Sequence, residues 1–98
     1  MLALSFPLIP PGKGEEASRI HELVLPVEAR LPVQVVQGAR DAFGSPAKVL
    51  SRLRRELGDR ADEVLAEQVR VDEAPGTHSF TDGDAVAAAV VDFWAPGP

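Results

Sequence analysis

The spacing of hydrophobic and polar residues changes along the chain between a strand-like and a helix-like period. Three segments have the length and pattern of strands: residues 2–6, 33–37 and 69–71. They are continuously apolar or alternate between apolar and polar residues, and they end at proline, at glycine or at a helical segment. After each of them, apolar residues recur every three or four positions, which indicates an amphipathic helix. Strands separated by helices form parallel sheets through right-handed crossovers. The pattern therefore predicts an α/β fold in three layers, with a partial parallel sheet of about three strands and flanking helices.

Local signals predict where the first two helices begin and end. Residues 15–25 place apolar side chains on one stripe, and Pro26 is expected to stop this helix. Ser45 followed by Pro46 is a strong start for the second helix, because the serine hydroxyl can cap free N–H groups and proline loses no needed donor there. Gly58 is expected to end this second helix.

The remainder of the chain predicts a third strand and a last helix. Residues 59–68 are ambiguous and could add another helical turn or two. The strict alternation of residues 69–71 predicts a half-exposed edge strand, whereas the nearly continuous apolar character of residues 2–6 predicts a strand covered on both faces. Thr81 followed by Asp84 resembles a capping box, from which the last helix is expected to start.

Two titratable residues follow strands at the same end of the predicted sheet. Loops after parallel strands lie together at the carboxyl ends, and these loops are residues 7–14, 38–45 and 72–81. The second carries Asp41 and the third carries His78. Such a carboxylate can accept the imidazole N–H, fix the ring's tautomer and stabilise the imidazolium. The same two residues also fit a plain turn or capping aspartate and a surface histidine near a helix start.

Composition narrows the classes of protein to consider. The 98 residues form at most one domain, residues 1–98, with a modest core. A net charge of −5 argues against a nucleic-acid partner. Without cysteine there is no disulfide framework or thiolate metal site, and no cofactor is expected. The longest apolar run is far shorter than a membrane span and no signal peptide is evident, so we expect a cytoplasmic protein with no membrane contact.

Three segments of the chain resemble those of α/β-hydrolases. Residues 35–46, which include Asp41, resemble the strand and acid segment of that family, and residues 74–80 resemble the segment that delivers its histidine, here His78. Residues 5–13 are similar to a proline-rich stretch of the dienelactone-hydrolase-like branch, near testis-expressed and chromatin-complex hydrolase-like proteins. The resemblance covers essentially the whole chain. It implies the C-terminal half of the fold and, in the full-length family, ester hydrolysis with Asp41 as acid and His78 as base.

The chain departs from the family pattern at two points. Thr77 stands where an aspartate often precedes the histidine, which affects local hydrogen bonding more than the assignment of His78. The family's nucleophile lies in a G-x-S-x-G elbow between a strand and a helix. The serines of this chain all lie outside such a context: Ser5, Ser18, Ser45, Ser51 and Ser79. The oxyanion-hole segment is absent as well, so the chain alone is expected to be inactive.

The leading hypothesis is a partial α/β-hydrolase that arises from a truncated gene, a late start codon or a split chain. A small-molecule ester is then a substrate only if a separate chain supplies the nucleophile half. The alternative hypothesis is a non-catalytic α/β interaction module that docks a partner through its exposed strand edge. In either case the strand from Leu2 to Phe6 presents an apolar, unpaired edge, through which self-association is expected.

Overall fold

A computed structural model describes residues 1–9, 12–14 and 18–95 of the chain. The elements in chain order are β1 (Leu2–Leu4), α1 (His21–Glu28), β2 (Val33–Gly38), α2 (Pro46–Leu57), the 3₁₀ helix η2 (Gly58–Arg60), α3 (Ala61–Glu67), β3 (Val69–Ala74) and α4 (Gly83–Trp94). The ambiguous residues 59–68 thus fall mostly within the two short helices η2 and α3. Strands and helices alternate, so the predicted fold class is confirmed.

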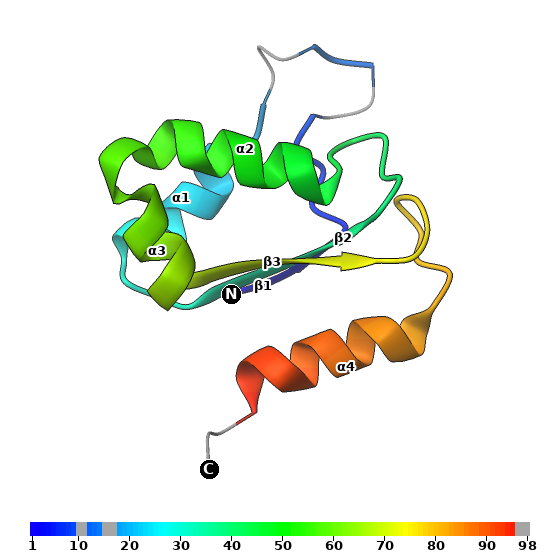
Figure 1. The fold of residues 1–98 in the computed structure, drawn as a ribbon. Coiled ribbons are helices and arrows are strands. Elements are labelled where there is room, and N and C mark those ends of the chain that lie inside the picture. Colours follow the sequence, from blue (N-terminus) through cyan, green and yellow to red (C-terminus); the bar gives the residue numbers. More distant parts are fainter. Residues whose placement is uncertain (10–11, 15–17, 96–98) are drawn as a thin grey trace.

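The three strands form one parallel sheet in the order β1-β2-β3. Val35 in β2 lies opposite Ala3 on one side and Val71 on the other. Figure 1 shows α1, α2 and α3 on one face of the sheet and α4 on the other, which gives the three predicted layers. Since β3 pairs with β2 alone among the described strands, it is the edge strand that its alternating sequence predicts. The parallel direction brings the loops after all three strands to the same edge.

Successive residues of β2 face opposite sides of the sheet, so this strand contributes to two cores. The larger core lies between the sheet and α1, α2 and α3. It is formed by Phe6, Leu8, Ile20, Leu23, Val27, Val33, Val35, Val49, Leu53, Leu57, Ala61 and Val69. The smaller core lies beneath α4 and is formed by Val36, Ala74 and Val86. The last helix therefore packs on the smaller of the two cores.

The first strand is shorter than predicted and is not covered on both faces. β1 ends at Leu4, because Ser5 adopts a left-handed backbone conformation with φ of 54°. Leu2 and Leu4 are 42% and 48% exposed. The prediction of two covered faces was wrong because α4 packs on β2 and β3, and an apolar sequence does not by itself bring a helix over the strand.

The first helix begins later and extends further than predicted. It starts at His21 and passes through Pro26 instead of stopping there, while the predicted residues 15–17 lie outside the described part of the chain. Leu23 and Val27 are four residues apart and both are buried against the sheet. Their burial outweighs the cost of the hydrogen bond that a proline inside a helix cannot donate.

The predicted boundaries of α2 are confirmed, but those of α4 need a correction. The hydroxyl of Ser45 caps α2 at 3.3 Å from a backbone N–H, and Gly58 follows its last residue. The last helix is capped by Asp82, which accepts a hydrogen bond of 3.0 Å, and not by a box of Thr81 and Asp84. Asp82 is the extended residue directly before the helix, so its carboxylate can reach the first-turn N–H groups. None of the described helices has the length and apolar character needed to cross a membrane.

Candidate active site

The loops after β2 and β3 approach each other closely at the carboxyl edge of the sheet. The backbone N–H of Arg40 donates to the carbonyl of Gly76 at 2.9 Å, which joins the two loops. Gly38, the last residue of β2, has no room for a side chain, since a Cβ atom there would lie 1.9 Å from the carbonyl oxygen of Thr77. A glycine at the end of β2 is therefore what allows the loops to touch.

The side chain of Asp41 is fixed between the two loops. It is fully buried, and its Oδ1 accepts a hydrogen bond of 2.9 Å from the backbone N–H of Phe43. Its Oδ2 lies 3.0 Å from Nδ1 of His78. Because a buried carboxylate is stabilised only when its oxygens are hydrogen-bonded, this pair of contacts sets both the position and the orientation of the Asp41 side chain.

His78 lies at the outer end of this pair and is supported on three sides. Its side chain is 41% exposed, and its ring meets the ring of Phe43 edge-on, with centroids 5.0 Å apart. The hydroxyl of Ser5 donates to the backbone carbonyl of His78 at 2.5 Å. Among the described residues, Nε2 of the ring has no hydrogen-bond partner. The ring is thus held at Nδ1 while Nε2 is left available for proton transfer.

Two residues to which the sequence analysis gave no role in the site, Gln37 in β2 and Ser5 directly after β1, connect the segment after β1 to the site. Gln37 is fully buried, and its amide nitrogen donates to the carbonyls of Phe6 at 2.9 Å and Gly44 at 2.5 Å. Its Oε1 accepts from the backbone N–H of Phe6 at 2.5 Å. Gln37 therefore ties this segment to the acid loop, as Ser5 ties it to the histidine loop. A polar residue in an otherwise apolar buried strand was the available signal for Gln37, whereas Ser5 carried none.

The arrangement of Asp41 and His78 suits proton transfer at an imidazole. An ionised carboxylate can only accept hydrogen bonds, so its contact with Nδ1 places the ring hydrogen there and the lone pair of the neutral ring on Nε2. The structure brings together the two residues that the loop positions single out, and their catalytic role stays a prediction. The second histidine, His21, lies exposed at the start of α1. Within the described ranges, no group of three or more His, Asp or Glu side chains could hold a metal ion.

Comparison with curated proteins and with solved structures gives no significant match. Comparison with protein families gives one, to the family described as alpha/beta hydrolase domain, over residues 1–84. The matched range contains all three strands and both residues of the Asp41–His78 pair. The chain therefore belongs to the α/β-hydrolase domain family.

Proposed function

We propose that residues 1–98 form a partial α/β-hydrolase domain that supplies the acid, Asp41, and the histidine, His78, of a hydrolytic triad. One observation carries this proposal, the 3.0 Å distance between Asp41 Oδ2 and His78 Nδ1 at the carboxyl edge of a parallel sheet. Membership of the family supports it, because the chain order in this fold is nucleophile, acid and histidine. We also propose that the protein acts in the cytoplasm.

The proposed chemistry gives each of the two side chains a separate role. Asp41 holds the Nδ1 hydrogen of His78, so Nε2 can take the proton of a nucleophile hydroxyl as its oxygen attacks the ester carbonyl carbon. The imidazolium formed in this step is stabilised by the carboxylate of Asp41. It then returns the proton to the oxygen of the leaving alcohol, and the same ring activates water for the second half of the reaction.

The nucleophile of this proposal comes from outside residues 1–98. No serine of the chain lies in a G-x-S-x-G context. The hydroxyls of Ser5 and Ser45 are already used, one for the histidine loop and one for capping α2. These residues alone should therefore not hydrolyse esters. The likeness to the dienelactone-hydrolase-like branch makes a small ester or lactone the substrate class that we propose for the completed site.

A complementation assay tests this proposal. The chain is mixed with a polypeptide that carries the nucleophile elbow, the first choice being the protein encoded directly upstream, and hydrolysis of a p-nitrophenyl ester is followed. We expect activity only in the mixture. Asp41→Asn should lower kcat by about 10⁴-fold, because the ring then adopts the wrong tautomer, and His78→Ala should lower it at least as far.

His21→Ala is the matched control for His78→Ala. His21 is exposed on α1, so its loss should leave both the stability and the rescued activity unchanged. Each variant is first compared with the unchanged chain in thermal unfolding, so that misfolding is not read as loss of chemistry. Rescued activity that survives His78→Ala would show that the role assigned to His78 is wrong.

The open edge of β1 supports a second candidate function, an interaction module without catalysis. Leu2 and Leu4 are about half exposed, and within the described residues β1 pairs with β2 alone. An extended segment of a partner could add there as a further strand. In that case Asp41 and His78 would be incidental. Partner binding that His78→Ala leaves unchanged, together with no rescued hydrolysis, would favour this function over the first.

A further inference from the structure

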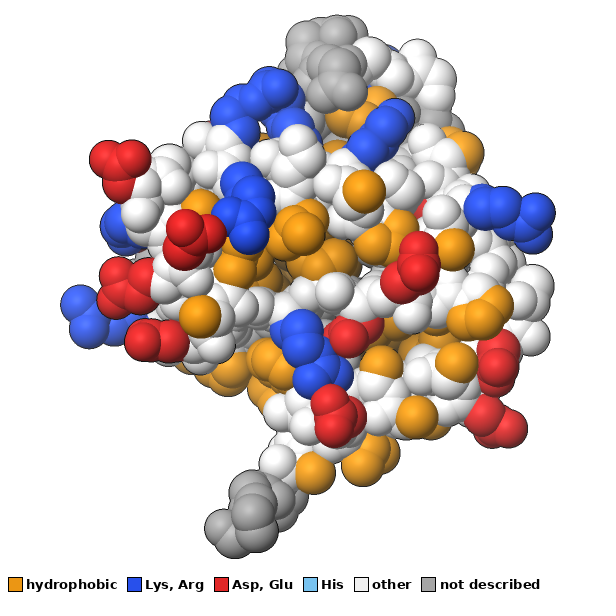
Figure 2. Space-filling model, in the orientation of Figure 1, with side chains coloured by type: hydrophobic (Ala, Val, Ile, Leu, Met, Phe, Trp, Pro, Cys, Tyr) orange, Lys and Arg blue, Asp and Glu red, His pale blue; other side chains and the backbone are white. Residues whose placement is uncertain are grey.

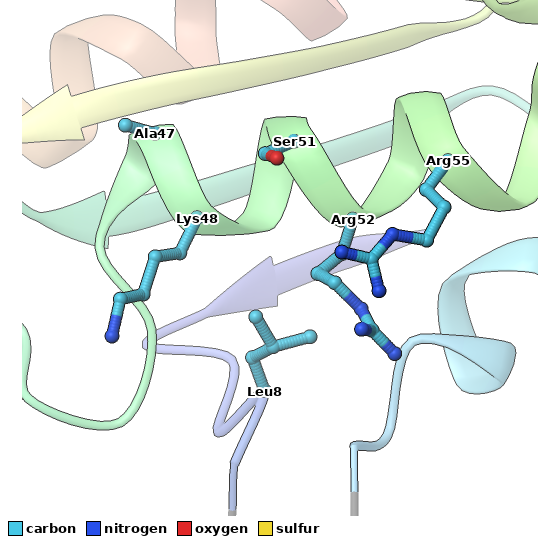
Figure 3. Close-up of a pocket in the computed structure, with 6 residues that line it drawn as sticks. All are labelled: Leu8, Ala47, Lys48, Ser51, Arg52 and Arg55. Atoms are coloured by element: carbon cyan, nitrogen blue, oxygen red, sulfur yellow. The ribbon is translucent and has the colours of Figure 1, made fainter. Parts of the chain in front are cut away.

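A pocket of about 510 Å³ lies between α2 and the segment after β1. Figure 3 shows the residues that line it, which are Leu8, Ala47, Lys48, Ser51, Arg52 and Arg55. Its volume falls within the range of small-molecule sites in proteins. Since neither Asp41 nor His78 lines it, this pocket is separate from the candidate active site.

The lining of the pocket is basic although the protein is acidic. Lys48, Arg52 and Arg55 are spaced by four and three residues, which places them along one stripe of the helix. In Figure 3 their side chains extend from α2 toward the side on which Leu8 lies, and Figure 2 shows basic side chains gathered over α2. Among the described residues that line the pocket none is acidic, while the whole chain has a net charge of −5. The pocket is therefore a local site of attraction for anions.

Two of these cations have no ionic partner within the described part of the chain. Neither Lys48 nor Arg55 forms an ion pair there, whereas Arg54 on the same helix pairs with Asp62 at 2.8 Å. Two positive charges match a phosphomonoester, which carries a charge of about −1.5 to −2 at neutral pH. The planar guanidinium of Arg55 suits two phosphate oxygens, and the hydroxyl of Ser51 can donate to a third.

We infer that this pocket binds a phosphomonoester, with Lys48, Arg55 and Ser51 on the phosphate and the organic part of the ligand beside Ala47. The volume supports such a ligand, because inorganic phosphate alone would fill only a small part of it. The inference does not depend on the proposed hydrolytic function, since the pocket shares no residue with that site.

Titration of the ¹⁵N-labelled chain with phenyl phosphate at constant ionic strength tests this inference. We expect saturable chemical-shift changes at the backbone amides of Ala47, Lys48 and Ser51. Lys48→Gln and Arg55→Gln should each weaken binding by about tenfold, as the loss of one charged hydrogen bond does. Both side chains belong to exposed residues, so the variants should fold normally.

Arg54→Gln is the matched control, because it removes the same charge from the same helix outside the pocket. It should change the affinity by less than about twofold, which is within the effect of a remote surface charge. Shifts that grow linearly without saturation, or equal weakening by Arg54→Gln and Arg55→Gln, would show nonspecific attraction and overturn the inference.

Two further probes identify the source of the phosphate. Inorganic phosphate should bind more weakly than phenyl phosphate, because it makes no contact beside Ala47; equal or tighter binding of inorganic phosphate would exclude a place for the organic part. Vesicles that contain phosphatidic acid test a lipid headgroup. The phosphomonoester is assigned to a lipid if the chain sediments with these vesicles and if Lys48→Gln and Arg55→Gln, but not Arg54→Gln, abolish this sedimentation. If the chain does not sediment with them, the phosphomonoester is assigned to a soluble molecule.

Discussion

At the scale of single residues, the contact between Asp41 and His78 depends on how closely their two loops approach. Gly38 leaves the space that the carbonyl of Thr77 occupies. Gly76, in the histidine loop, has φ of 116°, a conformation that residues with side chains rarely adopt. The two glycines therefore set the position of the imidazole relative to the carboxylate.

Gly38→Ala should destabilise the protein and separate the two loops. The added Cβ would meet the backbone of Thr77, which cannot swing aside as a flexible side chain can. We expect the free energy of unfolding in urea to fall by about 1–3 kcal/mol, the usual cost of overpacking. The NMR signals of the His78 imidazole should also change as its contact with Asp41 is lost. In the control Gly83→Ala, the added Cβ meets nothing within 4 Å, and equal destabilisation by both variants would contradict this account.

Ser5→Ala should loosen the histidine loop. It removes the 2.5 Å hydrogen bond to the carbonyl of His78 and keeps a residue with a side chain at φ of 54°. We expect a loss of about 1 kcal/mol in the free energy of unfolding. Ser5→Gly removes the same bond but relieves the backbone strain, so its loss should be smaller. If Ser5→Ala unfolds at the same urea concentration as the unchanged chain, the hydrogen bond contributes nothing.

The residues of the candidate site could be located from the sequence, but not the residues that hold them in place. Asp41 and His78 were found because a parallel sheet brings the loops after its strands to one edge. Gln37 and Ser5 bind the backbone of segments 31 and 73 residues away in the chain, a relation that no local pattern encodes.

At the scale of elements, α4 is attached to the sheet as much by hydrogen bonds as by apolar burial. Of the residues of this helix, all described, Val86 alone is buried. The indole N–H of Trp94 donates to Oε1 of Gln34 at 2.8 Å. The amide nitrogen of Gln34 donates to a carboxylate oxygen of Asp72 at 2.7 Å and to the carbonyl of Ala89 at 2.9 Å. Both the oxygen and the nitrogen of this buried amide are therefore hydrogen-bonded, and two of the three partners, Trp94 and Ala89, belong to α4.

Arg70 in β3 adds an ionic link to the same helix. Its guanidinium contacts the carboxylates of Asp72 at 2.8 Å and Asp92 at 2.7 Å, and it lies 5.3 Å from the ring centroid of Phe93. Hydrogen bonds to Asp72 and Asp92 raise the pKa of Arg70 above its ordinary value. Ion pairs near the surface contribute little to stability. The hydrogen bond between Trp94 and the buried Gln34 is therefore expected to contribute more to the attachment of α4.

Trp94→Phe should weaken the attachment of α4. The ring is kept, but the buried Oε1 of Gln34 loses its donor, and an unsatisfied buried acceptor costs about 1–3 kcal/mol. Urea unfolding measures this loss, and amide hydrogen exchange should be accelerated within α4. Val91→Ala is the control, since Val91 is 64% exposed and its truncation should cost less than about 0.5 kcal/mol. Equal effects of the two variants would contradict a special role of the indole N–H.

The order and type of the elements could be predicted, because strand and helix periods are visible in the sequence itself. The start of α4 differs through a local cap at Asp82, whereas the ends of β1 and α1 depend on distant contacts. β1 ends where Ser5 turns toward His78, a residue far along the chain. α1 continues past Pro26 because burial of Leu23 and Val27 outweighs a local penalty. Tertiary contacts therefore decided the end of β1 and the end of α1, which local propensity placed wrongly.

At the scale of the whole molecule, the main feature is the uncovered outer edge of β1. Leu2 and Leu4 are exposed, and the outer edge of β1 has no neighbouring strand among the described residues. Exposed apolar edges of this kind invite pairing with strands of other molecules. We therefore expect the 98 residues to self-associate at high protein concentration.

Leu4→Lys should reduce this self-association, because a charge on an edge strand opposes pairing with a second strand. Sedimentation velocity over a range of concentrations measures the effect. The control is Leu25→Lys, which adds the same charge at a leucine that is 67% exposed on α1, away from the edge. It should leave the association unchanged. A monomer with a sharp two-state unfolding transition above about 60 °C would contradict the expected self-association and the low stability that a modest core implies.

The hydrogen bond from Ser5 to the carbonyl of His78 spans the sheet from the end of its first strand to the loop after its third. We therefore expect a shift of β1 against β2 and β3 to move the backbone of His78 and, with it, the imidazole. A polypeptide that arrives at the outer edge of β1 would act on Ser5 and so on the histidine. The imidazole is then a natural reporter of assembly, whose NMR signals should respond to a docked strand before any substrate is present.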